Sequence, residues 1–332
     1  MKRNTTQNHR NLTLRLTITV ILLFSIFLLQ ACSGKSGDNN TVPTVLNFGY
    51  IGSNTLNLPT GAEGWGLHKG IIQEELKKHG IEQINTFGFP NGPDQSEALI
   101  SGRLNAGVIG DTPAIIAYSG GAKTRLVGQI NSGLKAFVIG KKNGPVTLKD
   151  LEGKTIAVPK GSYSHRYIIG LLKEQGITNY KLVHMLGSDA AAAIARGDID
   201  ANVGFGKDAL ALINQGYPIL HKSDDTPHLA GSSVLVVMED FLNKFPDFPK
   251  VWNEARDKAL ADLKQHETEY YEWMTQIVGM SNEDVRKLYP ISILTDQAFT
   301  DKTVKQLEGV KEFLIGEGLT KKEFKIEDWV AK

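Results

Sequence analysis

The chain alternates short runs of β-branched and aromatic residues with longer stretches in which apolar side chains recur at helical spacing. This alternation predicts strands and helices in turn, the arrangement typical of an α/β fold. Glycine-containing segments separate the elements and predict turns between them. In the first half, the pattern predicts strands over 45–51, 84–89, 106–109 and 124–130, and helices over 65–78, 93–101 and 113–118.

The same order of elements is predicted a second time further along the chain. Residues 102–108, Gly-Arg-Leu-Asn-Ala-Gly-Val, match residues 197–203, Gly-Asp-Ile-Asp-Ala-Asn-Val, at an offset of 95 positions. The sequence therefore indicates two copies of one α/β lobe. The second copy is predicted to contain strands over 154–158, 180–184, 201–203 and 217–220, and helices over 164–175, 190–196 and 209–214.

Two extended apolar runs, 134–140 and 232–238, flank the second copy, and mostly helical sequence follows from 239 to 316. Two such crossings predict that one lobe is discontinuous in sequence and that the other is inserted into it. We expect lobe 1 to comprise residues 44–133 plus 237–332, and lobe 2 to comprise residues 138–232. A ligand cleft would lie between the lobes, which would close about a hinge.

The N-terminal segment has the pattern of an export signal. Basic residues up to Arg15 precede 14 largely apolar residues, 16–29, and then Gln30, Ala31 and Cys32. A membrane-spanning helix needs roughly 20 apolar residues, so a signal peptide over residues 1–31 is predicted instead. Residues 29–32 resemble a bacterial lipobox, which predicts that Cys32 carries diacylglycerol and palmitate. A polar tether, residues 32–43, would then hold the protein at the extracytoplasmic face of the cell membrane.

Composition narrows the possible partners. The chain has 332 residues, of which 41% are hydrophobic, and Cys32 is its only cysteine, so no disulfide supports the fold. Without residues 1–31 the chain has 33 basic and 36 acidic residues, a net charge of −3. A nucleic-acid-binding domain is typically basic, so nucleic acid is excluded as an expected partner. We expect a monomer, because no long heptad seam is present.

Four predicted strand-to-helix turns combine glycine with hydroxyl, amide or charged residues. In open α/β sheets, ligands bind beyond the carboxyl ends of the strands. The unpaired N–H groups and positive dipole of a helix N-terminus favour an anionic head group there. The candidate ligand-binding residues are Ser53 and Asn54; Gly110, Asp111 and Thr112; Gly161, Ser162, Tyr163, Ser164 and His165; and Gly206 and Lys207.

Several of these residues also have a purely structural interpretation. Asp111 before a proline, and Ser162 or Ser164, are typical helix-capping residues. Lys207 and Asp208 could form a solvated ion pair. The sequence has neither the Gly-x-Ser-x-Gly nor the His-Glu-x-x-His motif, so we expect no catalytic residue, no metal site and no cofactor.

Segments 44–50, 67–76, 97–113, 148–157 and 159–165 resemble the solute-binding lipoproteins of ABC importers in the nitrate, taurine and aliphatic-sulfonate family. The resemblance implies a two-lobed periplasmic-binding-protein fold of type II. It also implies a small anionic solute, with an aliphatic sulfonate or taurine expected first, and an ABC permease with its ATPase as partners. Many members have Trp-Asp-Pro where this chain has Phe205, Gly206 and Lys207, a difference that affects the pocket.

Three other interpretations remain open from sequence. The same fold could bind nitrate, bicarbonate or a thiamine-pyrimidine precursor. A cleft enzyme could use His165 with Asp111 or Asp208 as acid and base. A sensor could bind the same ligands and signal through a partner.

Overall fold

The computed structural model describes residues 41–296, 298–320 and 322–331. The predicted signal peptide, Cys32 and most of the predicted tether lie outside these residues. Val42–Lys332 forms one compact unit. Within the described residues, no helix is both long and apolar enough to cross a membrane.

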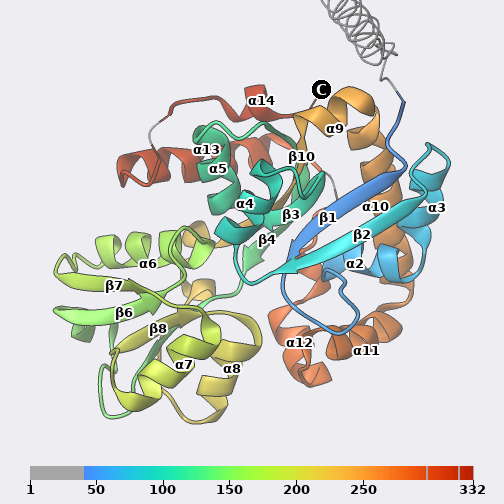
Figure 1. Ribbon diagram of the computed structural model, residues 1–332. Helices are drawn as coiled ribbons and strands as arrows, with labels where there is room; N and C mark the ends of the chain where they lie inside the picture. The colour runs from blue at the N-terminus through green and yellow to red at the C-terminus, as the bar shows by residue number, and fades with distance from the viewer. Residues whose placement is uncertain (1–40, 297, 321, 332) are drawn as a thin grey trace, which may run out of the picture. The chain divides into compact units, whose positions relative to one another are not determined.

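Lobe 1 is built on a five-stranded sheet in the order β2-β1-β3-β10-β4 (Figure 1). Strand β1 runs parallel to β2 and β3, whereas β10 pairs antiparallel with β3 and β4. The strands are β1 (Val45–Ile51), β2 (Gln83–Phe89), β3 (Ala106–Gly110), β4 (Thr124–Leu134) and β10 (Gly231–Met238). The helices are α2 (Gly61–His68), α3 (Ile71–Lys77), α4 (Gly92–Ile100), α5 (Asp111–Ser119), α9 (Glu239–Lys244), α10 (Phe248–Gln265), α11 (Glu267–Val278), α12 (Asn282–Leu288), α13 (Asp301–Gly316) and α14 (Ile326–Trp329).

Lobe 2 is built on a second five-stranded sheet, in the order β7-β6-β8-β5-β9. Strand β6 runs parallel to β7 and β8, and β5 pairs antiparallel with β8 and β9. Its strands are β5 (Phe137–Gly140), β6 (Lys154–Val158), β7 (Tyr180–His184), β8 (Ala201–Gly204) and β9 (Ile219–Lys222). Its helices are α6 (Tyr163–Glu174), α7 (Gly187–Arg196) and α8 (Gly206–Asn214). Single 3₁₀ turns are η1 (Leu148–Leu151), η2 (Ser223–Asp225) and η3 (Pro227–Leu229) in lobe 2, and η4 (Ile291–Ile293) in lobe 1.

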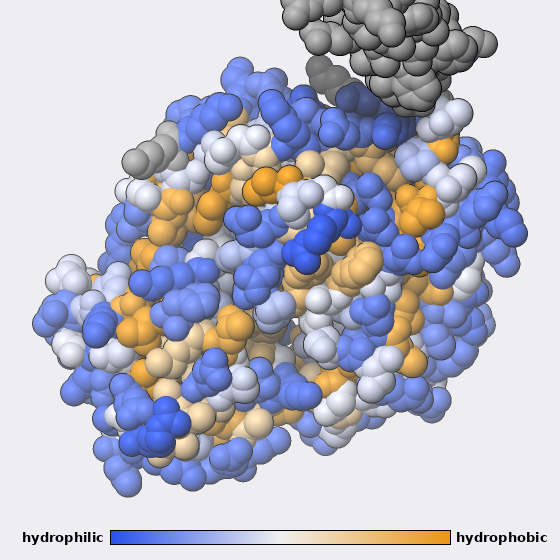
Figure 2. All heavy atoms as spheres, viewed as in Figure 1, coloured by the Kyte–Doolittle hydropathy of each residue, from blue (hydrophilic) through white to orange (hydrophobic). Residues whose placement is uncertain are grey.

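Helices cover both faces of each sheet, and apolar clusters fill the layers between them. On one face of the lobe 1 sheet, Phe48 of β1 stacks on Trp252 of α10 with ring centroids 4.7 Å apart, and both side chains are fully buried. The other face packs against α4, α5, α13 and α14. In lobe 2, α6 covers one face, and α7 and α8 cover the other. Figure 2 shows hydrophilic residues over most of the visible face, with hydrophobic residues scattered among them.

Most predicted strands and helices are observed with ends shifted by a few residues. Three differences bear on the lobes and the site. The single helix expected over 65–78 is two helices, α2 and α3, because Gly70 between them adopts a left-handed φ of +78°. Helix α5 begins at Asp111, so Gly110 is its N-cap and Asp111 does not cap it. The run at 232–238 is β10, which belongs to the lobe 1 sheet from Gly231 onward, whereas residues up to 232 were predicted in lobe 2.

Candidate functional site

The site lies where the carboxyl ends of the parallel strands of the two lobes approach each other. A side chain at Gly161, in the turn after β6, would place its Cβ only 3.1 Å from Cγ of Pro93, at the start of α4. A Cβ at Gly206, at the start of α8, would lie 2.9 Å from the hydroxyl of Tyr289, just after α12. At both positions a residue of lobe 2 therefore meets a residue of lobe 1 beside a helix N-terminus.

The turn from β6 into α6 supplies the richest set of polar groups. Ser162 is the N-cap of α6: its Oγ accepts from the N–H of His165 at 3.4 Å and donates to the carbonyl of Pro159 at 2.6 Å. Ser164 is fully buried, and its hydroxyl has no partner within the described residues. The N–H of His165 is already bonded to Ser162, whereas the N–H groups of Tyr163 and Ser164 have no acceptor in the helix. This helix end can therefore donate several hydrogen bonds to an anion.

His165 contributes a neutral imidazole to the same turn. Burial is the main cause that lowers the pKa of His165 from 6.5 to about 4, and the charges of Lys160 and His184 add to the effect. Its Nδ1 accepts from the N–H of Gly161 at 3.3 Å. A neutral ring that accepts through Nδ1 carries its proton on Nε2, so His165 has an N–H to donate there.

The lowered pKa of His165 predicts a pH-dependent stability. Between pH 6.5 and about 4 the unfolded chain binds the proton and the folded protein does not, so stability falls as the pH falls through this window. His165→Gln removes this contribution. We expect the free energy of unfolding, measured with urea at pH 7.0, 5.5 and 4.5, to decline less in the variant than in the wild type. An equal decline in the variant and the wild type would contradict the lowered pKa of His165.

The start of α4 stands opposite this turn and was not among the sequence-predicted residues. Asn91 is its N-cap: Oδ1 accepts from the N–H of Asp94, and Nδ2 donates to the Asp94 carboxylate, both at 2.9 Å. Pro93 follows within the first turn. An asparagine before a glycine and a proline is a signal for a helix start, so the sequence did contain the information.

Asp111 and Thr112 lie at the expected strand end, but their side chains bind other parts of the protein. Asp111 is fully buried, and its Oδ2 accepts from the N–H and the hydroxyl of Ser232 at 2.8 and 2.9 Å. Thr112 Oγ1 donates to Asp111 Oδ1 at 2.8 Å and accepts from Arg166 Nε at 3.0 Å. These polar atoms are therefore already hydrogen-bonded within the protein, which differs from the direct ligand contact expected of them.

Ser53 and Asn54 follow β1, and only Ser53 is exposed. The side chain of Asn54 organises its own loop: Nδ2 donates to the carbonyl of Leu58 at 2.8 Å, and Oδ1 accepts from the N–H of Leu58 at 3.2 Å. Tyr50 is buried, and its hydroxyl donates to Asn57 at 3.1 Å. The Asn54 side chain therefore stabilises its own loop, and its direct contact with a ligand stays a prediction.

Lys207 and Asp208 are both exposed at the start of α8. A Cβ on Gly187 would lie 1.8 Å from Oδ2 of Asp208, so this carboxylate sits directly over the first turn of α7. Burial, with a smaller effect of the Asp208 charge, raises the pKa of Tyr289 to about 12. Phe205, the N-cap residue of α8, is 45% exposed, so an aromatic face is available beside Gly206.

Two histidines outside this turn, His221 and His228, have hydrogen-bonding partners of their own. His221 Nδ1 lies 2.7 Å from the hydroxyl of Tyr167, and His228 Nε2 lies 2.7 Å from Glu174. Within the described part of the chain, no group of three or more His, Cys, Asp or Glu side chains is arranged to hold a metal ion.

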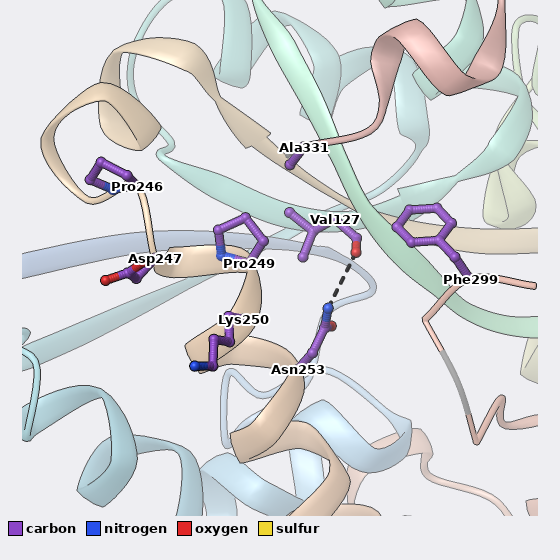
Figure 3. Close-up of a pocket in the computed structure, with 8 residues that line it drawn as sticks. All are labelled: Val127, Pro246, Asp247, Pro249, Lys250, Asn253, Phe299 and Ala331. Carbon is purple, nitrogen blue, oxygen red and sulfur yellow. Dashed lines mark hydrogen bonds between the residues drawn. The ribbon is translucent and has the colours of Figure 1, made fainter.

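A separate pocket of about 320 Å³ lies in lobe 1, and none of the predicted site residues lines it (Figure 3). In this pocket Asn253 Nδ2 donates to the carbonyl of Val127 at 3.4 Å. The lining residues are Val127, Pro246, Asp247, Pro249, Lys250, Asn253, Phe299 and Ala331. We place the candidate ligand site between the lobes, because the opposed helix N-termini lie there.

Two sheets with their parallel carboxyl ends facing each other define a two-lobed periplasmic-binding-protein fold. The chain belongs to the NMT1/THI5-like family, whose model matches residues 76–270. It is 25% identical over 322 residues, 94% of this chain and 93% of its relative, to a Bacillus subtilis (strain 168) protein named "Putative aliphatic sulfonates-binding protein". The expected resemblance to sulfonate-binding proteins and the expected fold class are thus confirmed.

Solved structures agree on the fold. The alkanesulfonate-binding protein SsuA from Xanthomonas axonopodis pv. citri, bound to MOPS, superposes with a TM-score of 0.72 at 19% identity, covering 87% of this chain and 98% of SsuA. The desulfurization enzyme DSZB superposes with a TM-score of 0.68 at 15% identity, covering 87% of this chain and 96% of the enzyme. The fold therefore occurs both in binding proteins and in an enzyme.

Proposed function

We propose that this protein is the extracytoplasmic solute-binding component of an ABC importer and captures a small organic anion, with an aliphatic sulfonate or taurine as its ligand. The observation that carries the proposal is the approach of the α6 and α4 N-termini, where Gly161 and Pro93 meet across the two lobes. The similarity to a protein named for binding aliphatic sulfonates supports the same ligand class.

Backbone and hydroxyl donors are sufficient for this task. Hydrogen bonds to a charged group contribute roughly 1.5–3 kcal/mol each, and a micromolar dissociation constant corresponds to about 8 kcal/mol. In the first turn of α6, the N–H groups of Tyr163 and Ser164 and the hydroxyl of Ser164 are such donors. Nε2 of His165 adds a further donor, and Gly161 lets the backbone come close. A sulfonate carries three oxygens that can accept from these groups.

The rest of the ligand would lie toward the α8 turn. Phe205 offers a half-exposed aromatic face, and Lys207 adds an exposed positive charge. Tyr163 is less suited to this role, because its ring is buried and its hydroxyl donates to the carbonyl of Leu134 at 3.0 Å. An alkyl group would therefore pack against Phe205.

Membrane attachment is part of the proposal. A diacylglyceryl group on Cys32 supplies two acyl chains, which is what stable anchoring requires. The protein would act as a monomer on the extracytoplasmic side, and closure of the lobes on the ligand would present the loaded form to a permease and its ATPase.

The catalytic interpretation has less support from the geometry, although DSZB shares the fold. The acid and base candidates for His165 are engaged elsewhere: Asp111 binds Ser232 and Arg166, and the Asp208 carboxylate lies over Gly187. We therefore propose binding without chemistry. Nitrate, bicarbonate and pyrimidine ligands serve as outcomes of the test below.

The test is a thermal-shift screen of the chain starting at Ser33, which retains the whole compact unit. The probes are ethanesulfonate, taurine, MOPS, nitrate, bicarbonate and a thiamine-pyrimidine precursor. A ligand at 100 times its dissociation constant adds about 2.7 kcal/mol of stability. We expect stabilisation by the sulfonates. Stabilisation by another probe alone would replace the ligand class, and no stabilisation by any probe would overturn the proposal.

A matched pair of variants locates the site. Ser162→Ala and Ser281→Ala each remove the N-cap of a helix, α6 and α12 respectively, at a cost of about 1 kcal/mol. Only Ser162→Ala is expected to weaken sulfonate binding in calorimetric titration. Equal affinity for the two variants would place the ligand elsewhere.

A further inference from the structure

The guanidinium of Arg166 links α6 of lobe 2 to lobe 1. Its side chain is only 4% exposed. Nη2 lies 3.4 Å from Oδ2 of Asp111, and Nε donates to Thr112 Oγ1 at 3.0 Å. Both partners belong to the first turn of α5, so a buried ion pair crosses directly between the lobes.

The same guanidinium also hydrogen-bonds to the segment that leads from lobe 2 back to lobe 1. Nη1 donates to the carbonyl of Leu229 at 3.4 Å, and Nη2 donates to that of Ala230 at 3.3 Å. This segment leads into β10, where Ser232 donates twice to the Asp111 carboxylate. Arg166 and Asp111 therefore both hydrogen-bond to the segment, residues 229–232, that leads from lobe 2 back to lobe 1.

The first turn of α6 also contacts the segment that leads from lobe 1 into lobe 2. The hydroxyl of Tyr163 donates to the carbonyl of Leu134, the last residue of β4. Its ring lies so close to Gly231 that a Cβ there would be 2.4 Å from the ring. The first turn of α6 thus contacts both crossings, three residues or fewer from the proposed anion-binding groups.

We infer that the Arg166–Asp111 pair is the pivot of lobe movement, and that it positions the N-terminus of α6 relative to lobe 1 without touching the ligand. A fully buried charge pair with satisfied hydrogen bonds has one preferred geometry, and breaking it leaves an uncompensated charge. The lobes therefore rotate around this point while it stays closed. This inference concerns the geometry of the lobes and holds whichever ligand is bound.

The chain contains a matched control within lobe 1. Arg256 of α10 donates to Glu63 of α2 at 2.7 Å and to the carbonyls of Thr295 and Ile130 at 2.8 and 2.9 Å. This pair is equally buried, with side-chain exposures of 2% and 1%. It also uses backbone carbonyls, but it does not connect the lobes.

The experiment compares Asp111→Asn with Glu63→Gln in the chain starting at Ser33. Spin labels on Lys77→Cys in lobe 1 and Ala195→Cys in lobe 2, both exposed positions, report the interlobe distance distribution without ligand. We expect both substitutions to lower the unfolding midpoint, but only Asp111→Asn to shift or broaden the distance distribution. A distribution equal to that of the Glu63→Gln variant would overturn the inference.

A milder variant decides the question if Asp111→Asn does not fold. Thr112→Val keeps both charges and removes the hydroxyl that joins Arg166 Nε to Asp111 Oδ1. We expect the same change in distance distribution at smaller amplitude. An unchanged distribution in this variant would also overturn the inference.

Discussion

Arg256→Met is expected to lower the free energy of unfolding by about 3–5 kcal/mol, because it leaves the carboxylate of Glu63 buried without a countercharge. Glu63 is fully buried, and its Oε2 has no hydrogen-bond partner within the described residues even in the presence of Arg256. The loss also removes one hydrogen bond from each of the carbonyls of Thr295 and Ile130. Chemical denaturation at pH 7 measures the effect.

The double variant Glu63→Gln with Arg256→Met provides the control. It removes both charges, so it is expected to recover part of the lost stability. An exposed ion pair gives the opposite reference: Arg196→Met, which breaks the surface contact with Asp198, is expected to change stability by less than about 1 kcal/mol. A similar loss in Arg196→Met and Arg256→Met would contradict the burial argument.

Gly161→Ala is expected to weaken sulfonate binding at least about tenfold, equivalent to about 1.4 kcal/mol. Two effects combine at this position. Gly161 has a left-handed φ of +79°, which costs an alanine roughly 1–2 kcal/mol. The new Cβ would also lie 3.1 Å from Pro93 Cγ, so the lobes would have to separate or the turn would have to shift. Isothermal titration calorimetry measures the affinity.

Gly176 separates the two effects, because it follows α6 at the opposite end. It has a φ of +69°, but a Cβ there meets nothing within 4 Å. Gly176→Ala is therefore expected to lower stability by about as much as Gly161→Ala while leaving the affinity unchanged. If both variants bind equally well, close approach of the lobes at Gly161 is not needed for binding.

The sequence predicted the order of strands and helices because that order follows from local patterns. The strand over 45–51 is observed as β1 with the same limits, and Ser162 caps α6 as one of the open interpretations stated. Helix ends at glycine were harder to predict. Gly70 divides a continuous amphipathic pattern into two helices, because its backbone φ is left-handed, and periodicity does not report φ.

The sequence did not reveal which polar residues face each other across the lobes. Arg166 sits among apolar residues of α6, and its partner Asp111 is 55 positions away, so no spacing rule connects them. Asp111 was consequently assigned to the ligand rather than to an internal ion pair. Tyr289 and Gly206 meet for the same kind of reason, through tertiary packing of distant segments.

The position of β10 has a consequence for how the protein folds. This strand lies between β3 and β4 in the lobe 1 sheet, yet the whole of lobe 2 precedes it in the chain. During synthesis, about 100 residues follow β4 before β10, which pairs with both β3 and β4, becomes available. Lobe 2, which is contiguous, can close its own sheet during that interval. We therefore expect lobe 1 to be the last part to reach its native state, together with the two segments that connect the lobes.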